Sequence, residues 1–228
     1  MITIEKARVS GIEEAIRGMR NPMNSWKQSD SDWEFVEDPA IINPDDQVMF
    51  ILGDKDRDLM LKLNAAGPSH SKYRRMIAVW VDITAPLYWW KEFDTYKVGT
   101  VADSCSTMHK LASRDLALDD FSWDHLIYDE PIPDRSVTSA GLLKLTIDIL
   151  NQYRRMYQQT KEKKYWWQMI QLLPSSYNQK RTVMLNYEVL AKIFEERKGH
   201  KLDEWREFLK WITTLPNSEI ITSKGEKE

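Results

Sequence analysis

The chain of 228 residues is 42% hydrophobic and 29% charged, with a formal net charge of −3 at pH 7, which suits one sizeable globular core. A slightly acidic chain has no general attraction for nucleic acid, so we expect no nonspecific nucleic-acid binding and a local pocket for any anion. The single Cys105 excludes an internal disulfide and a cysteine-based metal cluster, and the four scattered histidines argue against a zinc site.

No stretch of the sequence approaches the length and apolar content of a membrane span. A lone cysteine is typical of a reducing compartment, so the sequence predicts a cytoplasmic protein. Nothing marks a long linker, an internal repeat or a low-complexity segment. We therefore expect a single domain over residues 1–228.

The first part of the chain alternates predicted strands and helices around one long loop. The predicted strands are 2–9 and 75–83, the predicted helices are 12–19 and 54–66, and the predicted loop is 21–46. The second strand is rich in Ile and Val, which suits burial on both faces. Arg74 and Arg75 stand at its entrance, either as solvated residues or as cations for a ligand.

A helix followed by a polar run occupies 84–111. Thr84 is a candidate cap and Pro86 suits a first helical turn, after which the aromatic residues face inward. Lys97 is expected where the apolar stripe meets water, and Gly99 ends the periodicity. The next residues bring together hydroxyl groups and one carboxylate, which could hold a phosphate or a sugar; the alternative is an ordinary polar loop. They are Thr100, Asp103, Ser104, Ser106 and Thr107.

The second half is predicted to be mainly helical. Residues 113–135 are expected to be irregular with one short helix, and 136–159 a long helix that buries Leu142, Leu145 and Ile149. The Tyr165-Trp166-Trp167 run indicates a core or subunit-interface helix; the alternatives are base stacking and a membrane interface. Residues 201–215 predict an amphipathic helix, and the polar tail from residue 217 is expected to fray.

A helix over 178–198 is the main prediction for the remaining segment. Val183, Tyr187 and Leu190 follow a helical stripe, and Asn186 and Arg197 lie eleven residues apart, almost three turns. Both side chains are therefore expected along one edge, where a flat ligand could meet them. The simpler alternative makes Arg197 a cation at the helix C-terminus.

The order of these features resembles the flavin-dependent thymidylate synthase family. That family has a Leu-Pro pair, a Tyr-containing turn, an Asn and a later Arg, which match Leu173-Pro174, Tyr177, Asn186 and Arg197 without a gap. Its His-Ala-Gln-x-Glu segment matches His200 and Glu204 if one residue is deleted after the arginine. Its Pro-Leu-aromatic helix matches the helix that begins near Pro86.

The family's signature is largely replaced in this chain. Where the family has Arg-Gln, Arg-His-Arg and Ser-x-Asn-Glu-x-Ser-x-Arg-Tyr, this sequence has Lys91-Glu92, Thr95-Tyr96-Lys97 and the run from Thr100 to Met108. Two of three basic positions are neutral, and Ile170 replaces an arginine that holds the nucleotide phosphate. The cations in reserve are Arg74, Arg75, Lys180 and Arg181.

The resemblance implies an α+β fold, a twisted β-sheet packed with long helices. It also implies reductive methylation of dUMP, with methylenetetrahydrofolate giving the carbon and FAD, reduced by NADPH, carrying the hydride, in a homotetramer whose subunits share the sites. Matched to the family's cofactor-binding residues are Arg75, Lys97, Asp103, Asn186 and His200. Matched to its substrate-binding residues are Glu92, Ser104, Cys105, Ser106, Thr107 and Arg197, the last also as the catalytic residue.

Two hypotheses follow from the resemblance to the family and from the replacement of its signature residues. The first is a flavin-dependent enzyme acting on a pyrimidine nucleotide. The second is a nucleotide-binding or interaction protein that keeps the scaffold but has lost the reaction or binds another pyrimidine nucleotide. Cys105 is interpreted as a substitute for a family serine rather than a nucleophile, because no neighbouring group suggests a lowered thiol pKa.

Overall fold

The computed structural model describes residues 2–35 and 48–223, which group into two compact units. Unit 1 comprises Met1–Lys6, Val81–Lys97 and Ala102–Val183, and unit 2 comprises Ala7–Trp80, Val98–Val101 and Met184–Glu228. The single domain expected from sequence stays a prediction. Among the described residues, no helix combines the length and the apolarity that crossing a membrane requires.

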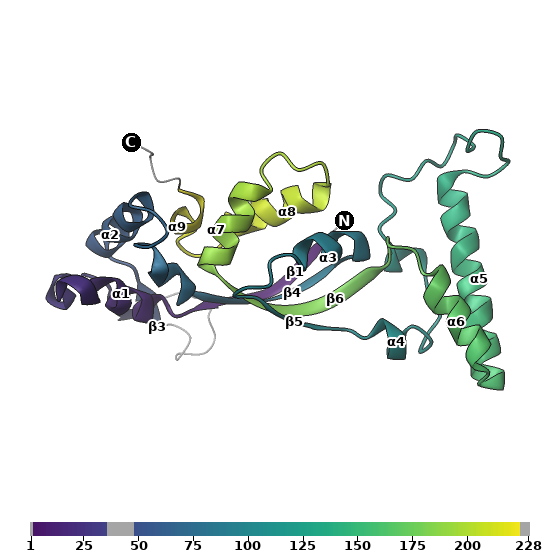
Figure 1. The fold of residues 1–228 in the computed structure, drawn as a ribbon, viewed down its shortest axis with the longest axis horizontal. Helices are drawn as coiled ribbons and strands as arrows, with labels where there is room; N and C mark the ends of the chain where they lie inside the picture. The colour runs from purple at the N-terminus through teal and green to yellow at the C-terminus, as the bar shows by residue number, and fades with distance from the viewer. Residues whose placement is uncertain (1, 36–47, 224–228) are drawn as a thin grey trace. The chain divides into compact units, whose positions relative to one another are not determined.

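A twisted open sheet has the strand order β1-β4-β6-β5 (Figure 1). The strands are β1 (Thr3–Ser10), β4 (Ala78–Pro86), β6 (Asn178–Asn186) and β5 (Val101–Ser104). In β4, Val79, Val81 and Ile83 are buried and alternate with more exposed residues, as the period of a strand requires. The mixed helix-and-sheet fold class predicted from the sequence is confirmed.

Besides its part of the sheet, unit 2 contains helices, 3₁₀ turns and an antiparallel pair of strands. Its helices are α1 (Ile12–Arg20), α2 (Asp54–Ala65), α7 (Tyr187–Glu196), α8 (Asp203–Ile212) and α9 (Glu219–Thr222). Its 3₁₀ turns are η1 (Asn21–Met23), η2 (Trp26–Gln28) and η4 (Lys72–Arg75). Helix α7 packs against α8, α9 and η4, so it lies at the centre of this unit.

Unit 1 contains α3 (Leu87–Phe93), α4 (Thr107–Lys110), η5 (Leu118–Asp120), α5 (Ser139–Thr160) and α6 (Lys163–Leu172). Helices α5 and α6 lie side by side (Figure 1). Leu143, Ile147 and Leu150 of α5 and Met169 of α6 belong to one buried cluster. This cluster is the core of the helical part of unit 1.

The buried face of α5 differs from the predicted one. Leu142 and Leu145, expected to be buried, are 47% and 52% exposed, whereas Leu143 is 7% exposed. The sequence offers two apolar stripes on neighbouring faces, and periodicity alone does not say which one the rest of the chain covers.

The helix predicted over 178–198 is wrong in its first half. Residues Asn178–Asn186 form β6, and helix α7 begins only at Tyr187. Gln179, Val183 and Leu185 are buried at strand spacing, so pairing within the sheet outweighed the apparent helical stripe.

Three further boundaries differ from the prediction. The predicted loop 21–46 includes β2 (Asp32–Phe35), which pairs in antiparallel fashion with β3 (Val48–Ile51), while 36–46 lie outside the described residues. The strand predicted at 75–83 starts at Ala78, after the turn η4. Within the tail from residue 217, Glu219–Thr222 form α9, which is held in place by the buried Ile220 and Ile221, while 224–228 lie outside the described residues.

Candidate functional site

Helix α3 is fixed by its aromatic residues. Trp89, Trp90 and Phe93 are almost completely buried, and the rings of Trp89 and Phe93 stack at 5.1 Å between centroids. Trp90 Nε1 donates a hydrogen bond of 2.9 Å to the backbone carbonyl of Gln179 in β6. Pro86 occupies the N-cap position in place of the predicted Thr84, and the helix ends at Phe93, so the exposed Lys97 lies beyond it.

The predicted polar run is an edge strand followed by one helical turn. Asp103, Ser104 and Cys105 are exposed, whereas Ser106 and Thr107 are partly buried. The backbone of Cys105 is held to β6, because its N–H donates to the Lys180 carbonyl and its carbonyl accepts from Gln179 Nε2, both at 2.9 Å. Three of these polar side chains therefore face solvent from a fixed backbone.

The signature positions that lost their charge serve structural roles in unit 1. Tyr96 is 6% exposed and packs against Phe93, with centroids 6.5 Å apart. Thr95 Oγ1 donates to the carbonyl of Glu92 at 2.7 Å, which closes the end of α3. Ile170 packs against the apolar cluster of α5 and α6. These positions contribute to packing and helix termination instead of carrying positive charge.

Two of the reserve cations are already neutralised within unit 1. Arg181 lies 4.2 Å from the centroid of the Trp90 ring and donates to Asp94 Oδ1 at 2.7 Å. Lys180 Nζ lies 3.1 Å from Glu5 and 3.3 Å from Asp82. The pKa of Asp82 is lowered, mainly by a hydrogen bond from Thr182 and then by Lys180. Neither cation is a simple substitute for the missing arginines.

Of the two arginines of η4 in unit 2, only one is committed to an ion pair with a described residue. Arg74 Nη2 lies 2.9 Å from Glu188 Oε2, and both side chains are largely buried. Arg75 is exposed and makes no ion pair with any described residue. It therefore remains available as a ligand-binding cation.

Asn186 begins α7 as its N-cap. Its Oδ1 accepts the backbone N–H of Val189 at 3.0 Å, which satisfies one of the free donors of the first turn. Gly99 lies close by with φ +80°, and a Cβ there would approach Asn186 Nδ2 to 3.0 Å and Val189 to 3.1 Å. Gly99 therefore leaves room for the cap.

Arg197 ends α7, so the two residues predicted along one helix edge instead mark its two ends. The Arg197 guanidinium lies 4.5 Å from the centroid of the fully buried Trp205. The ring of His200 also contacts Trp205, at 6.2 Å between centroids, and its Nδ1 accepts the N–H of Leu202 at 3.2 Å. Two residues matched to the family thus meet on one tryptophan, which the sequence analysis did not single out.

The structure divides the predicted site residues between the units. Unit 1 contains Glu92, Lys97, Asp103, Ser104, Cys105, Ser106 and Thr107. Unit 2 contains Arg75, Asn186, Arg197 and His200. Within unit 1 the polar run is one continuous segment, and within unit 2 Arg197 and His200 come together on Trp205. Their roles in binding stay predictions.

Comparison with known proteins gives the fold its context. No protein-family profile and no curated protein sequence matches the chain. Among solved structures, thymidylate synthase ThyX from Helicobacter pylori with FAD and dUMP matches with a TM-score of 0.64 and 13% identity over 100% of both chains. The UMP/dUMP methylase PolB from Streptomyces cacaoi bound with 5-Br dUMP matches with a TM-score of 0.58 and 14% identity, over 99% of this chain and 96% of that chain. The protein therefore has the fold of the flavin-dependent thymidylate synthases, as the resemblance in sequence implied.

Proposed function

We propose that the protein binds a uracil nucleotide and methylates it in a flavin-dependent reaction, the conversion of dUMP to dTMP. The observation that carries this proposal is the fixed position of Arg197 on Trp205 in a chain that shares the fold of ThyX along its whole length. Methylenetetrahydrofolate is the proposed carbon donor and NADPH the proposed reductant. We further propose a cytoplasmic homotetramer with shared sites.

Arg197 is the proposed catalytic residue because its charge is held in one orientation. A guanidinium stacked on a buried indole loses little freedom when a ligand arrives. Placed against a uracil ring, it would stabilise negative charge on the ring oxygens as the ring carbon becomes nucleophilic. No side chain needs to attack the pyrimidine in this reaction.

The residues proposed to bind FAD include both the cations and the polar groups that this cofactor requires. Lys97 and Arg75 are exposed cations with no carboxylate partner among the described residues, so each could meet a pyrophosphate. Asn186, His200 and Asp103 supply neutral and acidic groups for the polar edges of the cofactor. When bound, FAD supplies the hydride chemistry, while the protein supplies binding and orientation.

Substrate binding is assigned to the exposed polar run and its neighbour in α3. Ser104, Cys105, Ser106 and Thr107 offer hydroxyl and thiol groups to the sugar and phosphate, and Glu92 is a hydrogen-bond acceptor. Such contacts orient the nucleotide and exclude water from the ring that reacts.

The decisive experiment measures flavin and nucleotide together. Purified protein is loaded with FAD, reduced without oxygen and mixed with dUMP and methylenetetrahydrofolate. Oxidation of the reduced flavin that requires both compounds, with formation of dTMP, would support the proposal. Protein that takes up neither FAD nor dUMP would overturn it.

A second candidate function is a nucleotide-binding or interaction protein that has lost the reaction. It is favoured by the burial of Tyr96 and the packing of the partly buried Ile170 at positions where the family has cations, and by the ion pairs that occupy Lys180, Arg181 and Arg74. Tight binding of dUMP without any oxidation of bound reduced flavin would select this alternative.

A further inference from the structure

Helix α5 carries a second apolar stripe besides the face that joins the core of unit 1. Leu142 and Leu145 are 47% and 52% exposed, and Ile149 and Met156 are partly buried. None of these four is among the described residues that form the buried cluster of α5 and α6 or pack against it. A row of apolar side chains with two half-exposed leucines is the kind of surface patch that a partner molecule covers.

The stripe has the spacing of a coiled-coil seam. Its members follow one another at alternating intervals of three and four residues, and they are Leu142, Leu145, Ile149, Gln152, Met156 and Gln159. In the heptad notation abcdefg, the first, third and fifth of these are a positions and the others are d positions. Such a seam is covered when the side chains of a facing helix interdigitate with it. The stripe is therefore suited to another helix.

Helix α5 is long and is fixed before any partner arrives. It has 22 residues, and its first turn is capped because Thr138 Oγ1 accepts the backbone N–H of Gly141 at 3.0 Å. Its core-facing side is held by the buried Leu143, Ile147 and Leu150. The seam residues therefore keep their relative positions on a rigid support, which lowers the ordering cost of association.

Two residues of opposite charge flank the seam on one edge. Asp148 and Arg155 are seven residues apart, and each directly precedes an a position, so both occupy the g position of the heptad. Asp148 is exposed and makes no ion pair with any described residue. Arg155 Nη1 lies 3.9 Å from Asp115 Oδ1, and Asp115 is already held more closely by Arg154. Both flanking charges are therefore available to a second helix.

These charges distinguish between the ways in which α5 can pair with a second copy of itself. In an antiparallel pair the g positions face each other, so one register places Asp148 opposite the partner's Arg155, and twofold symmetry forms the same pair again. A shift by one heptad in either direction places two like charges opposite each other, which is unfavourable. In a parallel pair g faces e, where Tyr153 and Thr160 are neutral. Charge complementarity thus selects one antiparallel register.

The selected register also gives each seam residue a partner. Leu145 faces the partner's Met156, Ile149 faces the partner's Gln152, and Leu142 faces the partner's Gln159. Every layer then contains at least one apolar side chain. The two copies of Gln152 meet near the twofold axis, where their amide groups can hydrogen-bond to each other. A polar residue in a seam costs stability but fixes the register, as the flanking charges do.

We propose that the stripe of α5 binds the same stripe of a second copy of this chain, as an antiparallel helix pair in which Asp148 of each chain pairs with the partner's Arg155. Two charges and six seam residues of one helix make this surface self-complementary, as a twofold interface requires. The inference goes beyond the proposed function, because the contact needs neither nucleotide nor flavin. None of the residues proposed to bind those ligands lies on it.

The test is the association of the full-length protein without ligands, followed by sedimentation over a wide range of protein concentrations. The variants are Asp148→Arg, Arg155→Asp and the double exchange Asp148→Arg/Arg155→Asp. Asp58→Arg, an equal change of charge at an exposed position of α2, is the control. Leu145→Glu places a charge in the seam at a residue that is 52% exposed in the chain, and circular dichroism checks that each variant is folded.

Each single exchange should weaken association at least about tenfold, because it turns two attractive contacts into two repulsive ones, whereas Asp58→Arg should behave as the wild type. The double exchange should restore association, since both ion pairs form again with reversed sign. Leu145→Glu should abolish this contact. A wild type that stays monomeric, association unchanged in Leu145→Glu and the single exchanges, or a double exchange that restores nothing would overturn the proposal.

Discussion

The guanidinium of Arg197 lies 4.5 Å from the centroid of the Trp205 ring, and Trp205 is completely buried. This contact joins Arg197, the C-cap of α7, to helix α8, so the core of unit 2 positions the cation. A stacked guanidinium keeps its planar fork of donors turned in one direction. Function and packing are therefore separable at this site, since the charge and the ring can be changed independently.

Arg197→Lys should reduce the rate of the proposed methylation by roughly 10²–10³-fold, the usual cost of removing one donor that stabilises developing charge. Unfolding free energy should fall by no more than about 1 kcal/mol, because a partly exposed cation–π contact contributes about that much. Single-turnover oxidation of reduced flavin and urea unfolding measure the two effects. Lys192→Ala on the same helix is the control, and an unchanged rate in Arg197→Lys would exclude the catalytic role.

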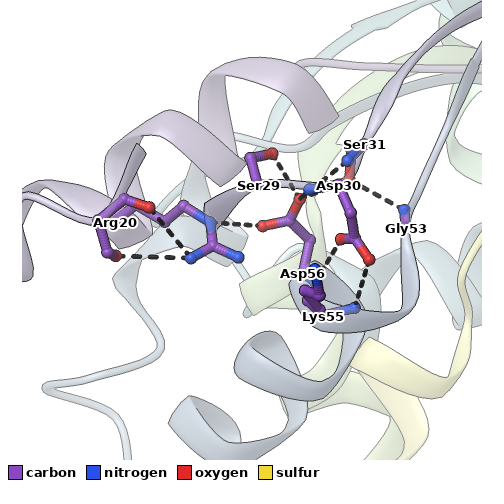
Figure 2. Close-up of polar contacts among 8 residues, drawn as sticks. Arg20, Ser29, Asp30, Ser31, Gly53, Lys55 and Asp56 are labelled. Carbon is purple, nitrogen blue, oxygen red and sulfur yellow. Dashed lines mark hydrogen bonds and ion pairs between the residues drawn. The ribbon is translucent and has the colours of Figure 1, made fainter. Parts of the chain in front are cut away.

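Asp56→Asn should destabilise the protein by about 3–5 kcal/mol, because it leaves the buried charge of Arg20 without its partner. Asp56 is 0% exposed, lies 2.6 Å from Arg20 Nε and also accepts two serine hydroxyl groups (Figure 2), so no water replaces the lost charge. Urea unfolding with Asp58→Asn, an exposed neighbour on α2, as control measures the difference. Equal stabilities of the two variants would show that the ion pair contributes little.

The same carboxylate predicts a loss of stability in acid. Burial by itself raises the pKa of Asp56, but hydrogen bonds from Ser29, Ser31 and Arg20 outweigh it and hold the pKa below its usual value. The stabilisation is therefore present above the unfolded pKa of about 3.9 and is lost as the pH falls through the lower folded value. Unfolding free energies of wild type and Asp56→Asn should converge below about pH 4; a constant difference would contradict this.

Gly99→Ala should destabilise the protein more than Gly199→Ala. Both residues have positive φ, +80° and +71°, so both changes cost about 1–2 kcal/mol of backbone strain. Only a Cβ on Gly99 meets the cap of α7, at 3.0 Å from Asn186 Nδ2, whereas nothing lies within 4 Å at Gly199. The extra destabilisation by Gly99→Ala should shrink when Asn186 is also changed to alanine, a change that itself costs about 1 kcal/mol. Chemical unfolding of the two glycine variants, each with and without Asn186→Ala, measures the difference.

The boundary between β6 and α7 could have been predicted from the sequence. The spacing between Asn186 and Arg197 was interpreted as almost three turns of one helix, and the predicted helical stripe ran through Val183, which belongs to the strand β6. Asn186 followed by Glu188 in a first turn is an N-terminal helix signal, and it marks the true boundary at Tyr187. The alternation of buried residues in β6, Asn178–Asn186, was a second signal of this boundary.

Other features depend on contacts that local sequence does not encode. Arg20 and Asp56 are thirty-six residues apart, so nothing in either segment announces a buried ion pair between them. A cavity lined by the end of α1, helix α2 and the segment around η4 was not predicted either, because these segments are far apart in the sequence. The buried aromatic residues of α3 were predictable, since three large rings in one short helix must be covered.

The two leucine stripes of α5 allow a direct test of which face the core covers. Leu143→Ala should cost about 2–4 kcal/mol, because Leu143 is 7% exposed and packs with Ile147, Leu150 and Met169. Leu145→Ala, at 52% exposed, should change the unfolding free energy by less than about 0.5 kcal/mol. Both variants remove the same atoms from the same helix, so intrinsic helix propensity cancels between them. Urea unfolding at a protein concentration low enough to prevent association measures the monomer, and a larger loss at Leu145 would mean that the originally predicted face is the buried one.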